Sequence, residues 1–432
     1  MFLNCNQNAV FLYLFSKQVN KKTNFFTYFT PMHNPKNSLP NGWSLKKLGE
    51  IAKITSGGTP DRSKPSYWNG EYPWISTSLI DFNVIEKSEE YITEEGLSNS
   101  SAKLFPIGTI LMAMYGQGKT RGKVALLGME AATNQACAAI ILNNGQTITD
   151  FVFQNLASRY EEIRGLSNVG NQENLNGELI KGLPVKLPPL AEQQKIATIL
   201  GTWDAALQTT NALLNALQKR KKGLMQQLLS PKPDWKEVRL GEVGSFSKGS
   251  GITKEELIEN GIPCIRYGEI YTVHHFVIRK YHSFISEQTA SSSKQIKQND
   301  ILFAGSGETL EDIGKAVAFI GTDEVYAGGD LIIFSPQGGD SIFLSYIINS
   351  AFVRKQIRAF GQGQSVVHLY SRDIEKLKIH LPPFTEQTRI AAILNAADAE
   401  LRQTEVYLEK LKTQKRGLMQ QLLTGKVRVT TR

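Results

Sequence analysis

Apolar residues recur at alternating spacings of four and three along residues 187–230. This is the spacing of the a and d positions of a coiled coil, and it predicts one long helix. The pattern returns in residues 381–424 at a constant offset of 194 (381 − 187), so the chain contains a duplication. Two matched seams in one chain most simply pack on each other. Two amphipathic helices in separate cores are the alternative.

The residues of the two expected seams come in equivalent pairs. Thr210 with Thr404 and Lys221 with Lys415 interrupt the seams at equivalent places, where polar residues usually fix register and partner. The apolar seam residues are Ile196, Leu200, Leu207, Leu214, Leu217, Leu224 and Leu228, with Ile390, Leu394, Leu401, Leu408, Leu411, Leu418 and Leu422.

The segments before the two helices read as β-rich domains with short runs of strand type separated by Gly, Pro and Ser. Trp43 aligns with Trp235, GTILMA (108–113) with NDILFA (299–304), and Gly122-Lys123 with Gly314-Lys315, so the two segments are expected to share one fold. Helical spacing recurs in 151–164 and 341–358.

These patterns predict an α+β protein with two similar β-rich α/β domains, separated by two long helices that pack as an antiparallel coiled coil in pseudo-twofold duplicated halves. The expected divisions are an extension, domain one, helix one, domain two, helix two and a tail. Their bounds are 1–31, 32–186, 187–230, 231–380, 381–425 and 426–432. The loop 230–234 contains two prolines and is short, which favours antiparallel pairing of the helices.

Composition narrows the class of protein. A formal net charge of +9 weakly favours a polyanionic partner, and 41% hydrophobic with 21% charged residues is typical of a globular protein. Cys5, Cys137 and Cys264 lie far apart without CxxC spacing, which predicts neither disulfides nor a metal site and suits a reducing cytoplasm. The apolar run 9–15 has the flanks of neither a signal peptide nor a membrane span, and residues 1–31 are expected to be poorly ordered.

Residues 113–120, AMYGQGKT, nearly match the phosphate loop GxxxxGK[ST]. That loop must be followed by a helix whose N-terminus holds the phosphates, whereas RGKVALLG after Thr120 is of strand type. A glycine-rich loop with these cations suits phosphate and base-edge contacts on DNA better.

Polar and aromatic side chains of the glycine-rich loops are therefore the candidate DNA contacts, and a flexible polar loop is the alternative. Asn and Gln can pair with adenine edges, and Arg and Lys with guanine or phosphate. The candidates in the first half are Thr59, Ser76, Gln117, Lys119, Thr120, Arg121, Lys123, Asn171 and Gln172. Those in the second half are Lys248, Arg266, Tyr267, Tyr271, Lys315, Gln362, Gln364 and Ser365.

Other conspicuous residues have structural interpretations. Trp68 and Trp74 can close a small β core instead of contacting DNA. His274 and His275 lack a partner at metal-ligand spacing, which favours a surface or core role. The basic run 219–222 is better explained as a solvated coiled-coil face than as a DNA clamp. No methyltransferase, dinucleotide or nuclease motif is recognisable, so the chain is predicted to be non-catalytic.

With duplicated EQxxI…GLMQQLL helices and the stretches GGTP…YWNGEYPWIS, YGQGKTRGK and NQACAAI, the sequence closely resembles the specificity subunit of type I restriction-modification systems. The resemblance implies that each β-rich segment is a target recognition domain reading one half of a split double-stranded DNA site. It implies that the helices hold two modification subunits, which methylate adenine, and recruit restriction subunits. The S-adenosylmethionine, ATP and Mg of such a complex are used by those subunits, and none is expected to be bound by this chain.

Two other functions remain open at this stage. A duplicated scaffold could bridge two protein partners without DNA, and an NTPase would rest on the near-match at residues 113–120 alone. The candidate loops of the two halves do not match, which implies an asymmetric target.

Overall fold

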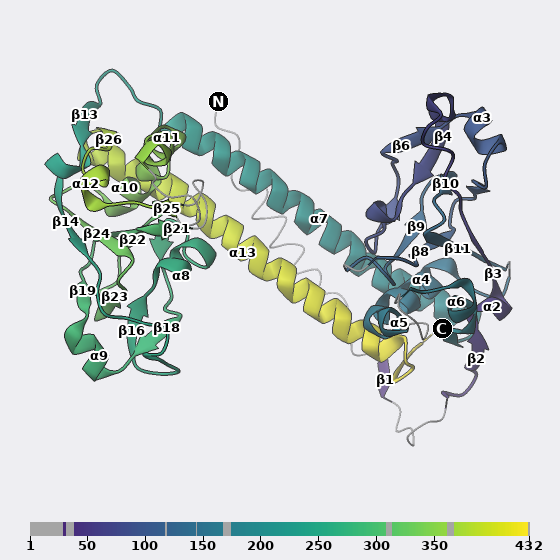
Figure 1. Ribbon diagram of the computed structural model, residues 1–432. Coiled ribbons are helices and arrows are strands. Elements are labelled where there is room, and N and C mark those ends of the chain that lie inside the picture. The colour runs from purple at the N-terminus through teal and green to yellow at the C-terminus, as the bar shows by residue number, and fades with distance from the viewer. Residues whose placement is uncertain are drawn as a thin grey trace. The chain divides into compact units, whose positions relative to one another are not determined.

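The computed structural model describes residues 29–31, 39–116, 119–143, 145–166, 174–307, 313–360 and 367–430. The chain divides into two compact units (Figure 1). Unit 1 comprises Met1–Thr209 and Leu408–Arg432, and unit 2 comprises Thr210–Tyr407. Each unit thus contains one β-rich domain and a segment of each long helix.

The domain of unit 1 is built on two sheets. The larger sheet has the order β3 (Ala52–Ser56), β11 (Cys137–Leu142), β8 (Ile110–Ala113), β9 (Val124–Leu127) and β5 (Val84–Ile85), antiparallel except for the β5–β9 pair. The second has the order β6 (Glu90–Ile92), β4 (Trp68–Ile75), β10 (Ala131–Thr133) and β7 (Leu104–Phe105). A separate ribbon pairs β2 (Ser44–Lys47) with β12 (Pro184–Leu187).

The domain of unit 2 repeats this topology, with one further strand, β15, in its second sheet. Its larger sheet runs β14 (Gly244–Lys248), β24 (Leu331–Pro336), β20 (Ile301–Ala304), β22 (Ala316–Phe319) and β17 (Val277–Ile278). Its second sheet runs β15 (Leu257–Ile258), β18 (Ser283–Ile285), β16 (Ile262–Ile265), β23 (Val325–Ala327) and β19 (Lys294–Ile296). The ribbon is β13 (Lys236–Arg239) with β26 (Lys378–Leu381), so the predicted duplication of the β-rich domain is confirmed.

Short helices cover the larger sheets. The stretch with helical spacing in unit 1 forms α4 (Thr149–Ser158) and α5 (Tyr160–Gly165), and its counterpart in unit 2 forms α10 (Ser341–Ile348) and α11 (Ala351–Phe360). The remaining short helices are α2 (Leu48–Ile51), α3 (Glu94–Ser98), α6 (Gly177–Gly182), α8 (Tyr267–Thr272), α9 (Glu287–Ser292) and α12 (Ser371–Ile374), with 3-10 turns at Pro65–Tyr67, Thr77–Leu79 and Leu240–Glu242.

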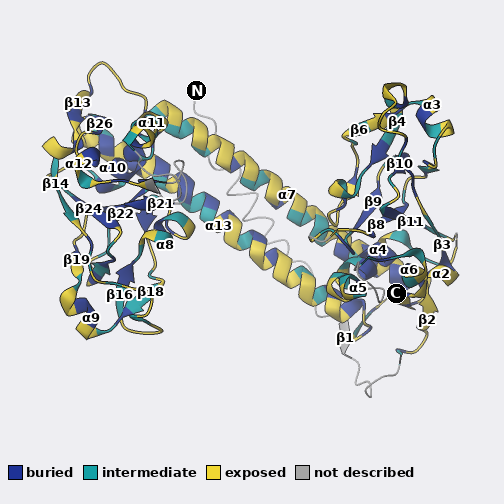
Figure 2. Cartoon of the chain, viewed as in Figure 1, coloured by how far each residue is buried: buried dark blue, intermediate teal, exposed yellow. Residues whose placement is uncertain are grey.

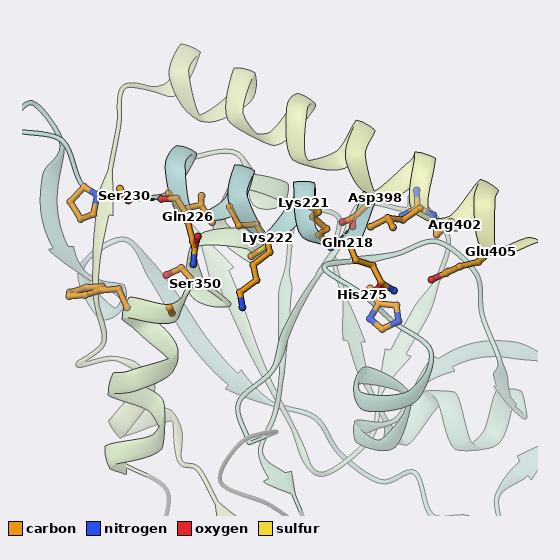
Figure 3. Close-up of a pocket in the computed structure, with 16 residues that line it drawn as sticks. Gln218, Lys221, Lys222, Gln226, Ser230, His275, Ser350, Asp398, Arg402 and Glu405 are labelled. Atoms are coloured by element: carbon orange, nitrogen blue, oxygen red, sulfur yellow. Dashed lines mark hydrogen bonds and ion pairs between the residues drawn. The ribbon is translucent and has the colours of Figure 1, made fainter. Parts of the chain in front are cut away.

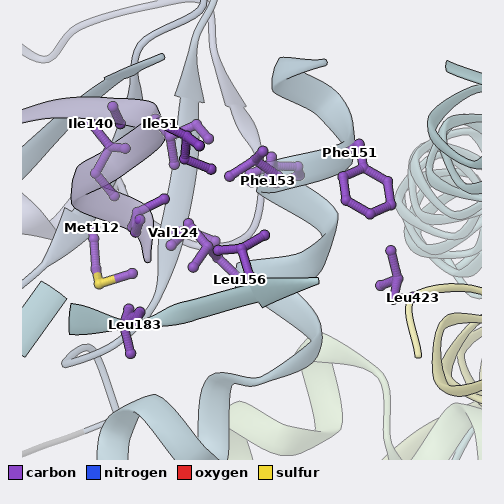
Figure 4. Packing of buried hydrophobic residues seen from close by; sticks show 14 of the residues in the cluster. Ile51, Met112, Val124, Ile140, Phe151, Phe153, Leu156, Leu183 and Leu423 are labelled. Carbon is purple, nitrogen blue, oxygen red and sulfur yellow. The ribbon is translucent and has the colours of Figure 1, made fainter. Parts of the chain in front are cut away.

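The main core of unit 1 lies between the larger sheet, α4 and the long helices. Phe151 and Leu156 of α4 are fully buried with Met112 and Val124 of the sheet, and Leu423 joins the same cluster from the end of the second long helix (Figure 4). Figure 2, coloured by burial, shows buried residues in dark blue along the strands of the domain. Apolar burial of this kind is the main stabilising contribution to such a unit.

The long helices are α7 (Leu190–Leu228) and α13 (Phe384–Leu422), and they run antiparallel within each unit. In unit 1, Asp204 of α7 pairs with Lys415 of α13, and Glu192 at the start of α7 pairs with Arg428 just beyond α13. In unit 2, Lys221 pairs with Asp398, and Arg220 pairs with Glu400. The predicted antiparallel packing is confirmed.

The expected seam residues all lie buried or half-buried along α7 and α13. Thr210 and Thr404 are each 7% exposed, and the two seam lysines, Lys221 and Lys415, meet aspartates of the opposite helix. Within the basic run 219–222, Lys219 and Lys222 are exposed as expected for a solvated face, but Lys221 is not.

Both ends of the described chain carry strands. β1 (Phe29–Pro31) pairs antiparallel with β27 (Val427–Val429), although residues 29–31 fall in the expected poorly ordered extension and 427–429 in the expected tail. Residues 1–28 lie outside the described ranges. Among the helices that the structure describes, none is both long enough and apolar enough to cross a membrane.

Candidate nucleic-acid interface

The candidate cations of unit 1 follow the end of β8, at one edge of the larger sheet. The turn is closed by backbone hydrogen bonds from Gly122 N to Ala113 O (2.9 Å) and from Ala113 N to Lys123 O (3.0 Å). Gly122 has φ of 84°, a conformation that L side chains rarely adopt, so glycine is required there. The strand β9 follows directly, as the sequence predicts, which argues against a phosphate loop.

The side chains of this turn differ in what they can reach. Lys119 is exposed, and its carbonyl oxygen accepts a hydrogen bond from the Tyr160 hydroxyl (2.6 Å), which holds the turn against α5. Lys123 is half-buried and pairs with Asp81 (Nζ–Oδ1 2.6 Å). Arg121 is only 7% exposed, and this burial favours a structural role over the predicted DNA contact.

The residues that follow a second candidate loop lie beside the first loop. Asn171 and Gln172 lie outside the described residues, as does Gln117, but the residues that flank them are placed. Leu175 N donates to Met114 O (3.0 Å), which joins the end of the 167–173 stretch to the start of the β8–β9 turn. The structure therefore brings the described flanks of the two candidate loops of unit 1 to the same sheet edge.

Unit 2 repeats this arrangement. Gly314 N donates to Ala304 O (3.0 Å) and Ala304 N to Lys315 O (3.1 Å), the counterparts of the bonds at Gly122 and Ala113. The two-residue strands β21 (Ser306–Gly307) and β25 (Val367–His368) pair, and Leu369 N donates to Gly305 O (2.9 Å). The 361–366 stretch, which contains Gln362, Gln364 and Ser365 outside the described residues, thus ends beside the β20–β22 turn.

Several candidates of unit 2 gather at this turn. The Tyr271 hydroxyl donates to Ser306 O (2.5 Å), and Lys315 Nζ donates to Tyr271 O (3.3 Å). Tyr267 is 39% exposed and packs edge to face on Tyr271, with ring centroids 6.5 Å apart. A free aromatic face beside a lysine suits stacking and phosphate contact. Lys248 is exposed, and it ends β14 at the same edge of the sheet.

The remaining candidates lie where the two sheets of each domain meet. In unit 1 the Thr59 hydroxyl donates to Gln135 Oε1 (2.5 Å), and Ser76 is hydrogen-bonded to Ser78 (Oγ–Oγ 2.6 Å). Asn134 N donates to Ile75 O just before Ser76, and Gly328 N donates to Ile265 O just before Arg266. Ser76 and Arg266 are therefore structural counterparts with different chemistry, in agreement with an asymmetric target.

The structural interpretation holds for the tryptophans. Trp74 is 3% exposed and its indole N–H donates to Gly58 O (2.9 Å), while the Arg62 guanidinium lies 3.8 Å from the centroid of the Trp68 ring. His274 is likewise buried, beside Glu269 (3.4 Å). Burial lowers the pKa of His275, with the nearby Lys315 and Lys221 contributing.

Sequence reasoning missed residues that hold the candidate loops in place. Gln135 and Tyr160 are examples, because each acts through a partner that is distant in sequence. For Gln135 a signal existed in the NQACAAI stretch. Asp204 and Asp398, which bond the domains to the long helices, were also missed, although they recur at the 194-residue offset.

Comparison with known proteins gives consistent matches over most of the chain. The pattern that defines the type I restriction modification DNA specificity domain matches residues 40–219 and again 232–412. A type I restriction enzyme specificity subunit, MjaVIII of Methanocaldococcus jannaschii, is 24% identical over 93% of this chain and 96% of its own length. A specificity subunit from Escherichia coli is 31% identical, but over 40% of this chain and 43% of its own length.

Solved structures show the same fold. The S subunit of a type I restriction-modification system from M. genitalium superposes with a TM-score of 0.60 at 17% identity, covering 91% of this chain and 98% of that one. A chain from a study of complex assembly and conformational transition in a type I system has a TM-score of 0.54 at 19% identity, covering 90% of this chain and 100% of that one.

Proposed function

Because this chain belongs to the family of type I restriction modification DNA specificity domains, we propose that it selects the DNA target of a type I complex. The β-rich domain of each unit, its recognition domain, reads one half of a bipartite, asymmetric site. The chain contributes recognition rather than chemistry. Modification and restriction subunits assembled on α7 and α13 supply the methyl transfer and cleavage in the cytoplasm, and they use the S-adenosylmethionine, ATP and Mg.

One observation carries the proposal. In both recognition domains, equivalent backbone bonds such as Gly122 N to Ala113 O and Gly314 N to Ala304 O hold the described residues that flank the candidate loops at the same edge of the same sheet. The side chains at the loops differ between the units, with Ser76 in one where Arg266 stands in the other. Equal scaffolds with unequal contact groups are what reading two different half-sites requires.

The test is to change one loop and follow both half-sites. The wild-type target is first identified by methylation-aware sequencing of DNA modified by the complex. Lys119→Ala with Thr120→Ala should relax reading of one half-site, and Arg266→Ala should relax reading of the other, each by a factor of about 10 to 100 per lost base contact. Arg121 is left unchanged because its burial would confuse a loss of contact with a loss of folding.

Lys46→Ala provides the matched control, since Lys46 is an exposed lysine of β2 in the same unit. It should leave the discrimination of both half-sites unchanged. Equal loss of specificity at both half-sites from either loop variant would contradict modular reading. Absence of salt-dependent duplex binding by the wild-type complex would instead support a protein scaffold.

A further inference from the structure

One short helix of each recognition domain is hydrogen-bonded to a long helix of its own unit at two points, beside contacts from other parts of the domain such as Arg279 with Asn395 in unit 2 and Trp43 with Glu192 in unit 1. In unit 2 the short helix is α10: Asp340 N, at its start, donates to Gln387 Oε1 of α13 (3.0 Å). Two turns later, the Tyr346 hydroxyl of α10 donates to Asp398 Oδ2 of α13. The domain is therefore held to α13 at two points along α10.

Unit 1 makes the same connection with different side chains. Ile148 N, at the start of α4, donates to Gln193 Oε1 of α7 (2.9 Å), and Gln154 Nε2 of α4 donates to Asp204 Oδ2 of α7 (2.5 Å). Gln193 and Gln387 are equivalent residues of the repeat, as are Asp204 and Asp398. The connection is thus part of the duplicated plan.

The aspartate of each connection also meets the opposite long helix. Asp398 pairs with Lys221 of α7, and Asp204 pairs with Lys415 of α13. In unit 2 the contacts close into a ring, because Lys221 Nζ lies 4.1 Å from the centroid of the Phe276 ring and Phe276 stacks on Tyr346 at 4.3 Å. One carboxylate thereby ties together both helices and the recognition domain.

Burial limits how much this network of contacts can add to the stability of the fold. The Asp398 side chain is 5% exposed and that of Lys221 is 15% exposed. A buried ion pair is often no more stabilising than apolar residues of the same volume, because both charges lose their hydration. The ion pair instead favours one relative arrangement of the helices and the domain, because all of its hydrogen bonds can be made only in that arrangement.

Apolar packing leaves this side of the interface incompletely filled. Ile390 and Leu394 of α13 pack into the core of the domain, but farther along α13 a cavity of about 610 Å³ opens between the domain and the helices. Asp398 and Lys221 line it with Leu401, and His275 faces them from the domain (Figure 3). Apolar packing is therefore concentrated at one end of the contact, and the polar group at Asp398 lies farther along α13.

We propose that Asp398 and Asp204 are positioning residues that set the orientation of each recognition domain on its helix segments, and with it the half-site spacing that the protein accepts. This inference rests on the proposed function. A domain free to turn about the apolar end of this contact would still read its own half-site, but it would accept half-sites at several separations.

The test uses Tyr346→Phe, which removes the hydroxyl group and keeps the ring that stacks on Phe276. The full complex with modification subunits is assayed for methylation of duplexes whose two half-sites have the native spacer or a spacer one or two base pairs shorter or longer. Loss of a hydrogen bond to a buried charge should reduce discrimination against the altered spacers about tenfold, with little change at the native spacer.

Two further variants keep the test decisive. Tyr326→Phe is the matched control, because its hydroxyl donates to Glu324 (2.7 Å) within the recognition domain, and it should retain wild-type spacer discrimination. Gln154→Leu removes the equivalent donor in unit 1 and should relax spacing as Tyr346→Phe does, which gives an independent result if one variant unfolds.

Wild-type spacer discrimination in both Tyr346→Phe and Gln154→Leu would overturn the inference, as would loss of half-site reading with spacing unchanged. A wild-type complex that showed no bipartite target would instead overturn the proposed function from which the inference starts. The two failures are therefore distinguishable in one experiment.

Discussion

The two units make the same connection between domain and helices at very different depths. Asp204 accepts from the amide of Gln154 and its side chain is 37% exposed, whereas Asp398 accepts from the hydroxyl of Tyr346 and its side chain is 5% exposed. The geometry has therefore been kept while the solvation has changed. Since an unpaired charge is costly only where water cannot reach it, the two connections should respond unequally to the loss of a partner.

The phenylalanines with left-handed backbones show the same contrast. Phe82 (φ 55°) lies two residues before β5 and Phe276 (φ 57°) lies one residue before β17, so they occupy neighbouring rather than equivalent positions of the repeat. Phe82 packs edge to face on Tyr160 within its own domain, at 5.3 Å between ring centroids. Phe276 instead stacks on Tyr346 beside Lys221 and so takes part in the contact with the helices.

The largest expected effect comes from removing the aspartates. Asp398→Ala leaves Lys221 buried without its carboxylate, and it should destabilise unit 2 by about 3–5 kcal/mol. Asp204→Ala should cost unit 1 about 1 kcal/mol or less: Lys415 is as buried as Lys221 (14% and 15% exposed), but Asp204 is 37% exposed, so water can enter where its carboxylate is removed and hydrate Lys415. Amide hydrogen exchange in α10 and α4 would measure the two effects separately. Equal acceleration in both helices would show that burial does not distinguish the connections.

A second contrast lies at the first turns of the long helices. Glu192 is 3% exposed at its side chain and receives two bonds from Arg428, both 2.7 Å, and one from the Trp43 indole (3.2 Å). Arg428→Ala should therefore cost unit 1 about 2–4 kcal/mol. Lys232→Ala should cost unit 2 below about 1 kcal/mol, since Lys232 is 46% and Glu386 is 18% exposed at their side chains.

Hydrogen exchange in the first turns of α7 and α13 would check this ordering. Arg428→Lys is the informative control, because it keeps the charge and loses the two-pronged geometry, so its cost should fall between those of wild type and Arg428→Ala. A larger effect of Lys232→Ala than of Arg428→Ala would contradict the comparison.

The smallest effect should appear in the pH dependence of unit 2. The hydrogen bond from Lys232 holds the pKa of Glu386 below its usual value of 4.5. Because the pKa of Glu386 is lower in the folded than in the unfolded protein, its ionised carboxylate stabilises the fold at pH values above the unfolded pKa. That contribution is lost as the pH falls through the folded pKa. Wild type should exceed Lys232→Ala in stability by a few tenths of a kcal/mol near pH 6, and it should lose this advantage as the pH falls below 4.5 through the lowered pKa of Glu386. Urea unfolding followed at α13 would detect it, and a difference independent of pH would point to another cause.

Much of the architecture could be predicted from the sequence because it depends on local and periodic patterns of residues. The seam of α7 and α13 follows from spacing alone, and the match of Gly122 with Gly314 correctly located equivalent turns. Antiparallel pairing followed from the short loop 230–234. These features depend on neighbouring residues or on the repeat, and both can be recognised in the sequence.

Features that depend on distant partners were not predictable in this way. In the sequence, Arg121 looks like an exposed cation of a loop. In the structure the turn packs on α5, where the Tyr160 hydroxyl donates to the carbonyl oxygen of Lys119, forty-one positions away, and Arg121 is buried. Asp204 and Asp398 lie beside the seam rather than in it, so periodicity gives them no role. Their recurrence at the same offset was the available signal, yet their partners Gln154 and Tyr346 differ.

The backbone bonds that tie the candidate loops together have an evolutionary consequence. The bond from Leu175 N to Met114 O, and the pairing of β21 with β25, each fix one end of two candidate loops: the β8–β9 turn and the 167–173 stretch in unit 1, and the β20–β22 turn and the 361–366 stretch in unit 2. Once the ends of a loop are fixed, the loop can lengthen or change in sequence with little loss of stability, since doubling its length costs about 0.6 kcal/mol. Mutation and recombination can therefore rewrite these stretches while the sheets and helices stay folded, so a lineage can acquire a new target without passing through an unstable intermediate.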